Sequence, residues 1–223
     1  MRKTTLNGKV IPYDKTVEEL AKMAKSSSMQ DFSLACEALS FKPCNEAYEI
    51  MKSYVDDKDK YRRLYILKTI FRHLQATELK WFLEDSISSD DWLFAENGLQ
   101  VVSDLKIKVS EEILIGGIYK HLPKLYTAVS ALCTLDVNDD NFHVLQDIYA
   151  RAKLCVQKEC ICDILFEKYL PSKSRELFEM CCGSEFGKIR VWAVKLGRQY
   201  GYDISSFASD KDGHVQKTVN KPL

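Results

Sequence analysis

Metal binding is the first chemistry to consider, because five of the eight cysteines fall in one stretch of the chain: Cys155, Cys160, Cys162, Cys181 and Cys182. Zinc is usually held by two pairs of thiolates, with two to four residues between the members of a pair. The spacings here are shorter, and adjacent side chains diverge on a helix. We therefore expect reduced thiols that serve mainly as small core residues, and no metal or other cofactor.

The sequence contains no motif that anchors a known class of catalysis. Its four histidines are scattered: His73, His121, His143 and His214. The metalloprotease, nucleophile-elbow, phosphate-loop and dinucleotide-binding patterns are absent. His143 and Asp147 could share one helix face, but such a pair is typical of a solvent-exposed helix. We expect a protein that is not an enzyme.

Helix capping and exposure to solvent explain the clusters of charged residues better than a binding role does. The acidic pairs Asp56-Asp57, Asp90-Asp91 and Asp139-Asp140 each precede a predicted helix, where carboxylates can accept from free N–H groups; an acidic edge that binds a basic partner is the alternative. The basic stretch from Lys60 to Arg72 predicts a solvated helix face, with a phosphate-binding stripe as the alternative. Because 32 basic residues balance 32 acidic ones, nucleic acid and anionic membranes are disfavoured as partners.

The elements that must position these residues are helices, since apolar residues recur with a helical period and only nine glycines and five prolines interrupt them. We predict helices over residues 16–27, 30–40, 45–56, 59–74, 76–87, 91–105, 109–121, 123–135, 140–152, 154–169, 173–182 and 187–200. Thr16 and Glu19 have the spacing of a capping box. The fold class is all-α.

Three segments follow from this pattern. Residues 1–15 form an N-terminal arm, extended or folded as a small hairpin around Asn7-Gly8. Residues 16–204 form the helical domain, and 205–223 a flexible C-terminal tail. No apolar run follows the basic N-terminus, and none is long enough to span a membrane, so we expect a cytoplasmic protein.

An internal repeat emerges from residues 187–201, "GKIRVWAVKLGRQYG". Its apolar spacing of Ile189, Ala193 and Leu196 recurs at earlier positions, with a step of about 31–33 residues. The recurrences are Leu125, Val129 and Leu132; then Phe94, Gly98 and Val101; then the segment from Leu64 to Phe71. Each is followed by a second apolar helix. A helix pair of this size cannot bury both faces alone, so stacking into an α-solenoid is the natural result.

The motif Ile189-Arg190-x-x-Ala193-x-x-Leu196-Gly197 resembles the first-helix pattern V-R-x-x-A-x-x-A-L-G of HEAT repeats, one residue shorter before the final Leu-Gly. The resemblance covers residues 30–201, and only this last unit is close, because the earlier units lack the arginine. It implies a HEAT-like or armadillo-type superhelix of antiparallel helix pairs.

Such repeat proteins bind extended partners on a concave face lined by second helices. The residues outside the apolar stripe there are Trp81, Glu84, Tyr119, Tyr149 and Glu179. Each is a candidate contact to a protein or peptide, or else a core residue between repeats. We expect an adaptor, or a scaffold of the neutralising or immunity type.

The alternative is a DNA-binding protein similar to the HEAT-like alkylpurine DNA glycosylases. Trp192 beside Arg190 is the feature that suggests it. The neutral net charge disfavours it, because a protein that neutralises many phosphates needs a sustained cationic track.

Overall fold

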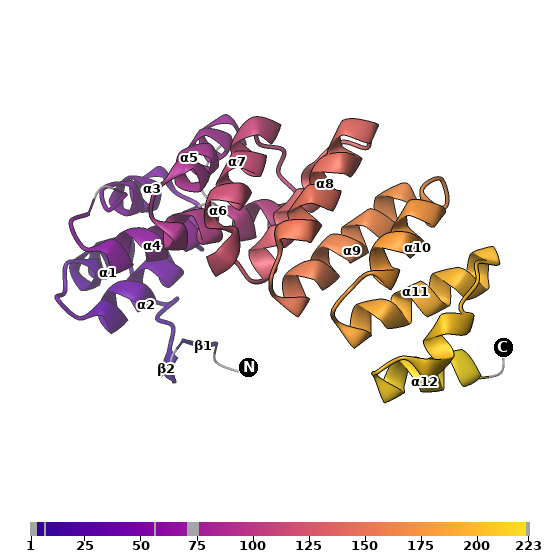
Figure 1. Cartoon of the computed structure of the whole chain (residues 1–223). Helices are drawn as coiled ribbons and strands as arrows, with labels where there is room; N and C mark the ends of the chain where they lie inside the picture. The colour runs from indigo at the N-terminus through magenta and orange to yellow at the C-terminus, as the bar shows by residue number, and fades with distance from the viewer. Residues whose placement is uncertain (1–3, 7, 56, 71–75, 222–223) are drawn as a thin grey trace. The chain divides into compact units, whose positions relative to one another are not determined.

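The computed structural model describes residues 4–6, 8–55, 57–70 and 76–221 (Figure 1). Most of these residues lie in helices, and the strands are limited to one short hairpin. The all-α class predicted from the sequence is therefore confirmed. The predictions on Asp56, Phe71, Arg72 and His73 lie outside the described residues.

The chain divides into two compact units, Met1–Gly117 and Ile118–Leu223, where one continuous domain over 16–204 was expected. The first unit holds β1 (Thr5–Leu6), β2 (Lys9–Val10), α1 (Val17–Ala24), α2 (Met29–Leu39), α3 (Asn45–Lys52), α4 (Lys60–Thr69), α5 (Ala76–Ser88) and α6 (Trp92–Leu105). Helix α7 (Glu111–His121) contains the boundary. The second unit holds η2 (Leu122–Lys124), η3 (Thr127–Thr134), α8 (Asp139–Arg151), α9 (Cys155–Tyr169), α10 (Ser174–Cys182), α11 (Gly187–Tyr200), η4 (Ser205–Ser209) and α12 (Gly213–Asn220).

The N-terminal arm is a hairpin, one of the two forms predicted. Strands β1 and β2 pair antiparallel, with Thr5 opposite Val10 and Leu6 opposite Lys9. Gly8 has φ +79°, a left-handed conformation that glycine adopts without the steric cost of a Cβ atom. The turn residue predicted from Asn7-Gly8 is thus in place.

Several helices begin at the kind of capping residue that the sequence predicts. The Thr16–Glu19 capping box is present: Glu19 N donates to Thr16 Oγ1 at 3.2 Å, and Thr16 N donates to Glu19 Oε2 at 2.9 Å. Asp91 caps α6 by accepting from Leu93 N at 3.0 Å. At two other starts the cap is a neighbour of the predicted acidic pair: Asp59 caps α4 and Asn138 caps α8.

The core of the first unit lies between α1, α2 and α3, and α4 packs against both α2 and α6. Phe32 on α2 is fully buried at its centre, and its ring receives the Arg62 guanidinium at 4.8 Å. The stretch from Lys60 to Arg72 was expected to be a solvated face. Arg62 departs from this because its long side chain covers an apolar ring while its head donates to the Ser26 carbonyl.

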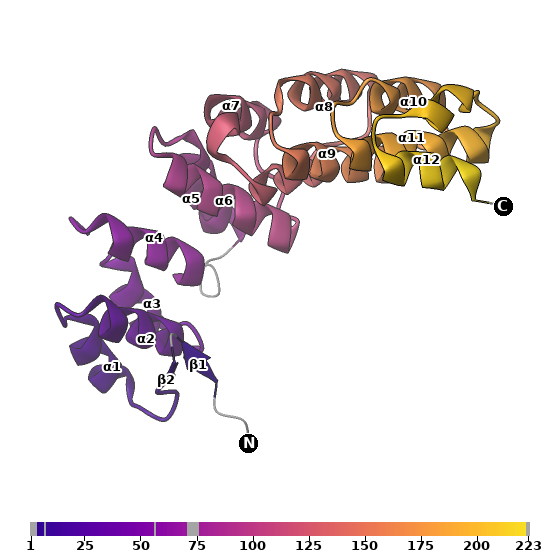
Figure 2. The same cartoon turned by 60° about the horizontal axis from the view of Figure 1, so that its bottom comes forward.

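In the second unit α8 packs on α9, α10 on α11, and α11 on α12, which are neighbours in the sequence, and α9 also packs on η3, which precedes α8. Figure 2 shows α8 and α10 in one row of this unit and α9 and α11 in the other. Leu145, Leu165, Leu177 and Ile189, one from each of these helices, are fully buried. The core therefore runs between the two rows.

One predicted helix, 123–135, is replaced by two 3-10 segments, η2 and η3, that meet at an extended Leu125. The physical reason is a bond from far along the chain. The Gln157 side chain donates to the Leu122 carbonyl at 2.7 Å and also to the Leu125 carbonyl. These carbonyls would otherwise accept from the next turn of a continuous α-helix.

The predicted flexible tail is wrong for residues 205–220, where η4 and α12 pack on each other and α12 packs on α11. Two arginines of α11 hold the segment. Arg190 binds Asp210 twice, and Arg198 donates to the carbonyls of Val219 at 2.7 Å and Lys221 at 2.6 Å. Buried Phe207 and Val215 add apolar contacts to these bonds, so the segment is ordered although its sequence has little apolar periodicity.

Candidate functional site

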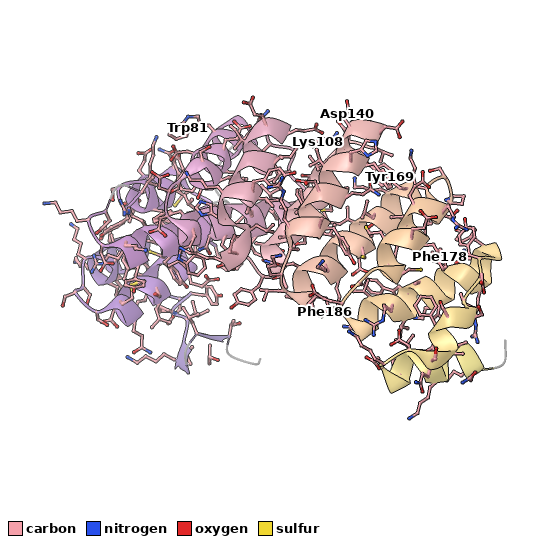
Figure 3. All side chains as sticks on the ribbon, in the orientation of Figure 1. Trp81, Lys108, Asp140, Tyr169, Phe178 and Phe186 are labelled. Carbon is pink, nitrogen blue, oxygen red and sulfur yellow. The ribbon has the colours of Figure 1, made fainter. Side chains whose placement is uncertain are left out.

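Trp81 and Glu84, both on α5, have different roles. Trp81 is 67% exposed, and Figure 3 shows it projecting from the outer side of the helix. Such exposure of a large aromatic side chain keeps Trp81 as a candidate contact. Glu84 Oε1 instead accepts from Ser110 N at 2.7 Å, directly before α7 begins. Its carboxylate thus holds the start of α7.

Tyr119 lies in the strongest candidate site of the second unit, an open recess that we call the α8 recess. The recess is lined by Tyr119, Leu122, Pro123, Asp147, Arg151 and Lys153. Asp147 Oδ2 accepts from the Tyr119 hydroxyl at 2.6 Å and from Arg151 Nε at 2.7 Å. The Arg151 guanidinium also lies over the Tyr119 ring, 5.3 Å from its centre. One aromatic ring and one ion pair are thereby fixed at the protein surface.

Three side chains of the α8 recess, Tyr119, Asp147 and Arg151, have shifted pKa values. Partial burial and the bond to Asp147 raise the pKa of Tyr119 to about 12, so the hydroxyl stays a donor at neutral pH. The bonds from Tyr119 and Arg151 lower the pKa of Asp147, and the same carboxylate raises the pKa of Arg151. At neutral pH these shifts keep the Tyr119 hydroxyl protonated and keep Asp147 and Arg151 charged.

The buried side chain of Gln157 on α9 links two backbone segments, one of which contains Leu122 and the other Lys153 of the α8 recess. Its side chain is 1% exposed, and its Nε2 donates to the carbonyls of Leu122 and Leu125. Its Oε1 accepts from Lys153 N at 3.2 Å and from Leu154 N at 3.1 Å. All donor and acceptor sites of the amide are used. The backbone at Leu122 and Lys153 is consequently held in register.

Tyr149 was predicted as a partner contact, and the structure corrects this. It is only 6% exposed, because it lies on the inner side of α8 with the Lys158 ammonium 4.4 Å above its ring. Burial raises the pKa of its hydroxyl. Tyr149 is a core residue, the other role that its position in the sequence allowed.

Glu179 belongs to a second surface cluster, on α10. Arg175 Nε donates to Glu179 Oε1 at 2.6 Å, and the Arg175 guanidinium lies 5.1 Å from the centre of the Tyr202 ring. The Tyr202 hydroxyl is 2.8 Å from the Ser174 hydroxyl. The cluster therefore repeats the composition of the α8 recess: an arginine stacked on tyrosine and paired with an acid one turn away.

Arg151, Arg175 and Tyr202 were not among the residues predicted from the sequence. The signal was present for the arginines, because Asp147–Arg151 and Arg175–Glu179 are oppositely charged pairs at i, i+4. The sequence suggested that Asp147 shares a helix face with His143. In the structure the His143 Nδ1 atom lies 3.3 Å from Gln146 Oε1. The stacking of each arginine on a tyrosine joins separate elements, and no local spacing predicts it.

The cysteines do not assemble into a site within the described part of the chain, where no group of three or more His, Cys, Asp or Glu residues could hold a metal. Of the five clustered cysteines that were expected to be mainly core residues, Cys162 and Cys181 are buried, whereas Cys155, Cys160 and Cys182 are partly exposed. The hydrogen bond with Cys181, together with burial, raises the pKa of Cys162, so that thiol stays protonated at neutral pH.

Comparison of the chain with protein-family models, curated proteins and solved structures finds no match. Among the described helices, none combines the length and the apolar character needed to cross a bilayer.

Proposed function

We propose that this protein is a non-enzymatic module that binds a protein or peptide, with its helix pairs stacked as in HEAT-like α-solenoids. The stacking is supported by hydrogen bonds between residues about one expected period apart. Gln157 binds the Leu125 carbonyl, 32 residues away, and Lys168 Nζ donates to the Leu135 carbonyl, 33 residues away, at 2.7 Å. The Tyr169 hydroxyl donates to the Asn138 carbonyl, 31 residues away, at 3.0 Å.

The observation that carries the binding role is the pair of surface clusters on α8 and α10. Both present an arginine over a tyrosine ring, at 5.3 Å for Arg151 on Tyr119 and 5.1 Å for Arg175 on Tyr202. Tyrosine and arginine are the residue types that, with tryptophan, contribute most to binding energy at protein interfaces. Since α8 and α10 share one row of helices (Figure 2), one partner could contact both clusters.

The same structure weighs against the DNA-glycosylase alternative. Arg190 is 6% exposed and its donors are used by Asp210 and by the carbonyls of Ser184 and Glu185. Trp192 packs edge-on against Phe166, with ring centres 5.5 Å apart. Both residues that suggested a base-binding site therefore serve the packing of the second unit.

The test is affinity capture of proteins from a lysate of the source organism, with the immobilised full chain and quantitative mass spectrometry. The surface variant Tyr119→Ala/Arg175→Ala is compared with wild type and with Lys195→Ala, which removes an exposed lysine of α11 in the other row. We expect at least one protein to bind wild type and Lys195→Ala equally, and the surface variant about tenfold less. Identical capture by all three proteins, or none above bare matrix, would contradict the proposal.

A further inference from the structure

The α8 recess has two cationic side chains, Arg151 and Lys153, with donors available to a ligand. Asp147 Oδ2 accepts from the Tyr119 hydroxyl and from Arg151 Nε. Arg151 makes no hydrogen bond through Nη1 or Nη2 to any residue in the described part of the chain, and its side chain is 63% exposed. Lys153 adds a second exposed cation on the same lining. The lining therefore carries two cations against one carboxylate.

The guanidinium of Arg151 is also preorganised. Its Nε is tied to Asp147 one helical turn earlier, and its plane is supported by the Tyr119 ring. Little side-chain entropy remains to be lost when a ligand binds to its outer edge. The two Nη groups of that edge form the planar fork that matches a carboxylate.

The remaining lining residues are apolar: Pro123, which is exposed, and Leu122, which is 5% exposed. Proline and tyrosine surfaces bind extended peptide backbone and apolar side chains at low entropy cost. A phosphate polymer fits less well, because the lining carries only two cations and the whole chain has no net charge, so a sustained cationic track is missing from this recess. The chemistry that matches all of this is a carboxylate next to an apolar residue.

We propose that the α8 recess binds an acidic segment of the partner protein, with an Asp or Glu carboxylate on Arg151 and Lys153 and an adjacent apolar residue against Tyr119, Leu122 and Pro123. This inference rests on the proposed function and names the class of partner.

The first test is selection of random twelve-residue peptides displayed on phage against the immobilised full chain. We expect the selected peptides to be enriched in Asp and Glu beside an apolar residue. Selected peptides without acidic enrichment would overturn this inference and leave the binding function standing. No selection above an unrelated folded protein would overturn both.

The second test measures the affinity of one selected peptide by fluorescence anisotropy. We expect Arg151→Gln/Lys153→Gln to bind the peptide at least about tenfold more weakly, and Lys195→Gln to bind it like wild type. A peptide in which each Asp or Glu is replaced by Asn or Gln should lose affinity for the wild-type protein to a similar degree. Circular dichroism verifies that each variant is folded. Equal binding by the double variant would overturn the inference, and so would tighter, Arg151-dependent binding of single-stranded DNA.

Discussion

Arg190 and Asp210 join α11 to the segment between η4 and α12 through two hydrogen bonds, Nε to Oδ2 and Nη2 to Oδ1, each 2.7 Å long. The side chains are 7% and 9% exposed, so the pair is shielded from solvent. Arg190 thus fastens the C-terminal segment to α11.

Replacing Arg190 should therefore cost stability. Arg190→Ala leaves the Asp210 carboxylate buried without its partner, and we expect the free energy of unfolding to fall by about 3 kcal/mol. Urea unfolding followed by circular dichroism measures this. Arg175→Ala, which removes an exposed arginine from a similar pair, should lose clearly less. Equal losses of unfolding free energy in the two variants would show that the buried Arg190–Asp210 pair stabilises the fold no more than an exposed pair does.

The same pair predicts a pH dependence. The bond from Arg190 lowers the pKa of Asp210 below its ordinary value of about 4. Its ionised form therefore stabilises the fold above about pH 4, and this contribution is lost as the pH falls through the lowered value. The stability difference between wild type and Asp210→Asn should be largest near neutral pH and should shrink steadily as the pH falls below about 4. A difference that does not change with pH would refute this assignment.

The stability of the fold should depend on the hydrogen bonds of the Gln157 side-chain amide. Gln157→Leu keeps the approximate volume but removes the side-chain donor to the carbonyls of Leu122 and Leu125, of which, in the described part of the chain, only the Leu122 carbonyl keeps a bond, from Leu125 N. We expect a loss of about 3 kcal/mol in the free energy of unfolding. Gln157→Glu should lose at least as much, because a carboxylate cannot donate to carbonyls. Amide hydrogen exchange at Lys153 and Leu154 should accelerate more in Gln157→Leu than in Gln157→Glu, because the glutamate carboxylate still accepts from both amides. Unchanged exchange there, or an equal loss in the exposed control Gln199→Leu, would contradict this role.

Two adjacent glycines of α7 should respond in opposite ways to alanine. A Cβ atom at Gly117 would lie 2.9 Å from the Ile87 carbonyl oxygen, whereas one at Gly116 would meet no atom within 4 Å. We expect Gly117→Ala to destabilise by about 1–3 kcal/mol. Gly116→Ala should stabilise by about 0.5–1 kcal/mol, because alanine favours the helix. Thermal unfolding of both variants gives the comparison, and effects of the same sign would disprove the close approach of α7 to Ile87.

Local chemistry made much of the helical pattern predictable. Thr16 and Glu19 are three residues apart, so their capping box could be recognised without knowledge of the fold. Gly201, with φ +74°, ends α11 next to the predicted boundary at residue 200. Features that depend on few neighbouring residues were therefore within reach of the sequence.

The errors share a different origin, because each depends on contacts across many residues. The break at Leu125 depends on Gln157, and the order of the C-terminal segment depends on Arg190 and Asp210. The candidate site was found only in part for the same reason. Tyr119 was predicted, but its partner Arg151 comes from the end of the next helix, and the burial of Tyr149 depends on how α8 faces the core.

The most direct test of a partner at the α8 recess is photo-crosslinking in living cells of the source organism. A photoreactive benzoyl-phenylalanine is placed at Lys153, which lines the recess, or at Lys195, which lies exposed on α11 in the other row of helices. Irradiation should produce a covalent adduct with one discrete protein from position 153 and none from position 195. Adducts from position 195 alone, or from neither position, would contradict partner binding at this recess.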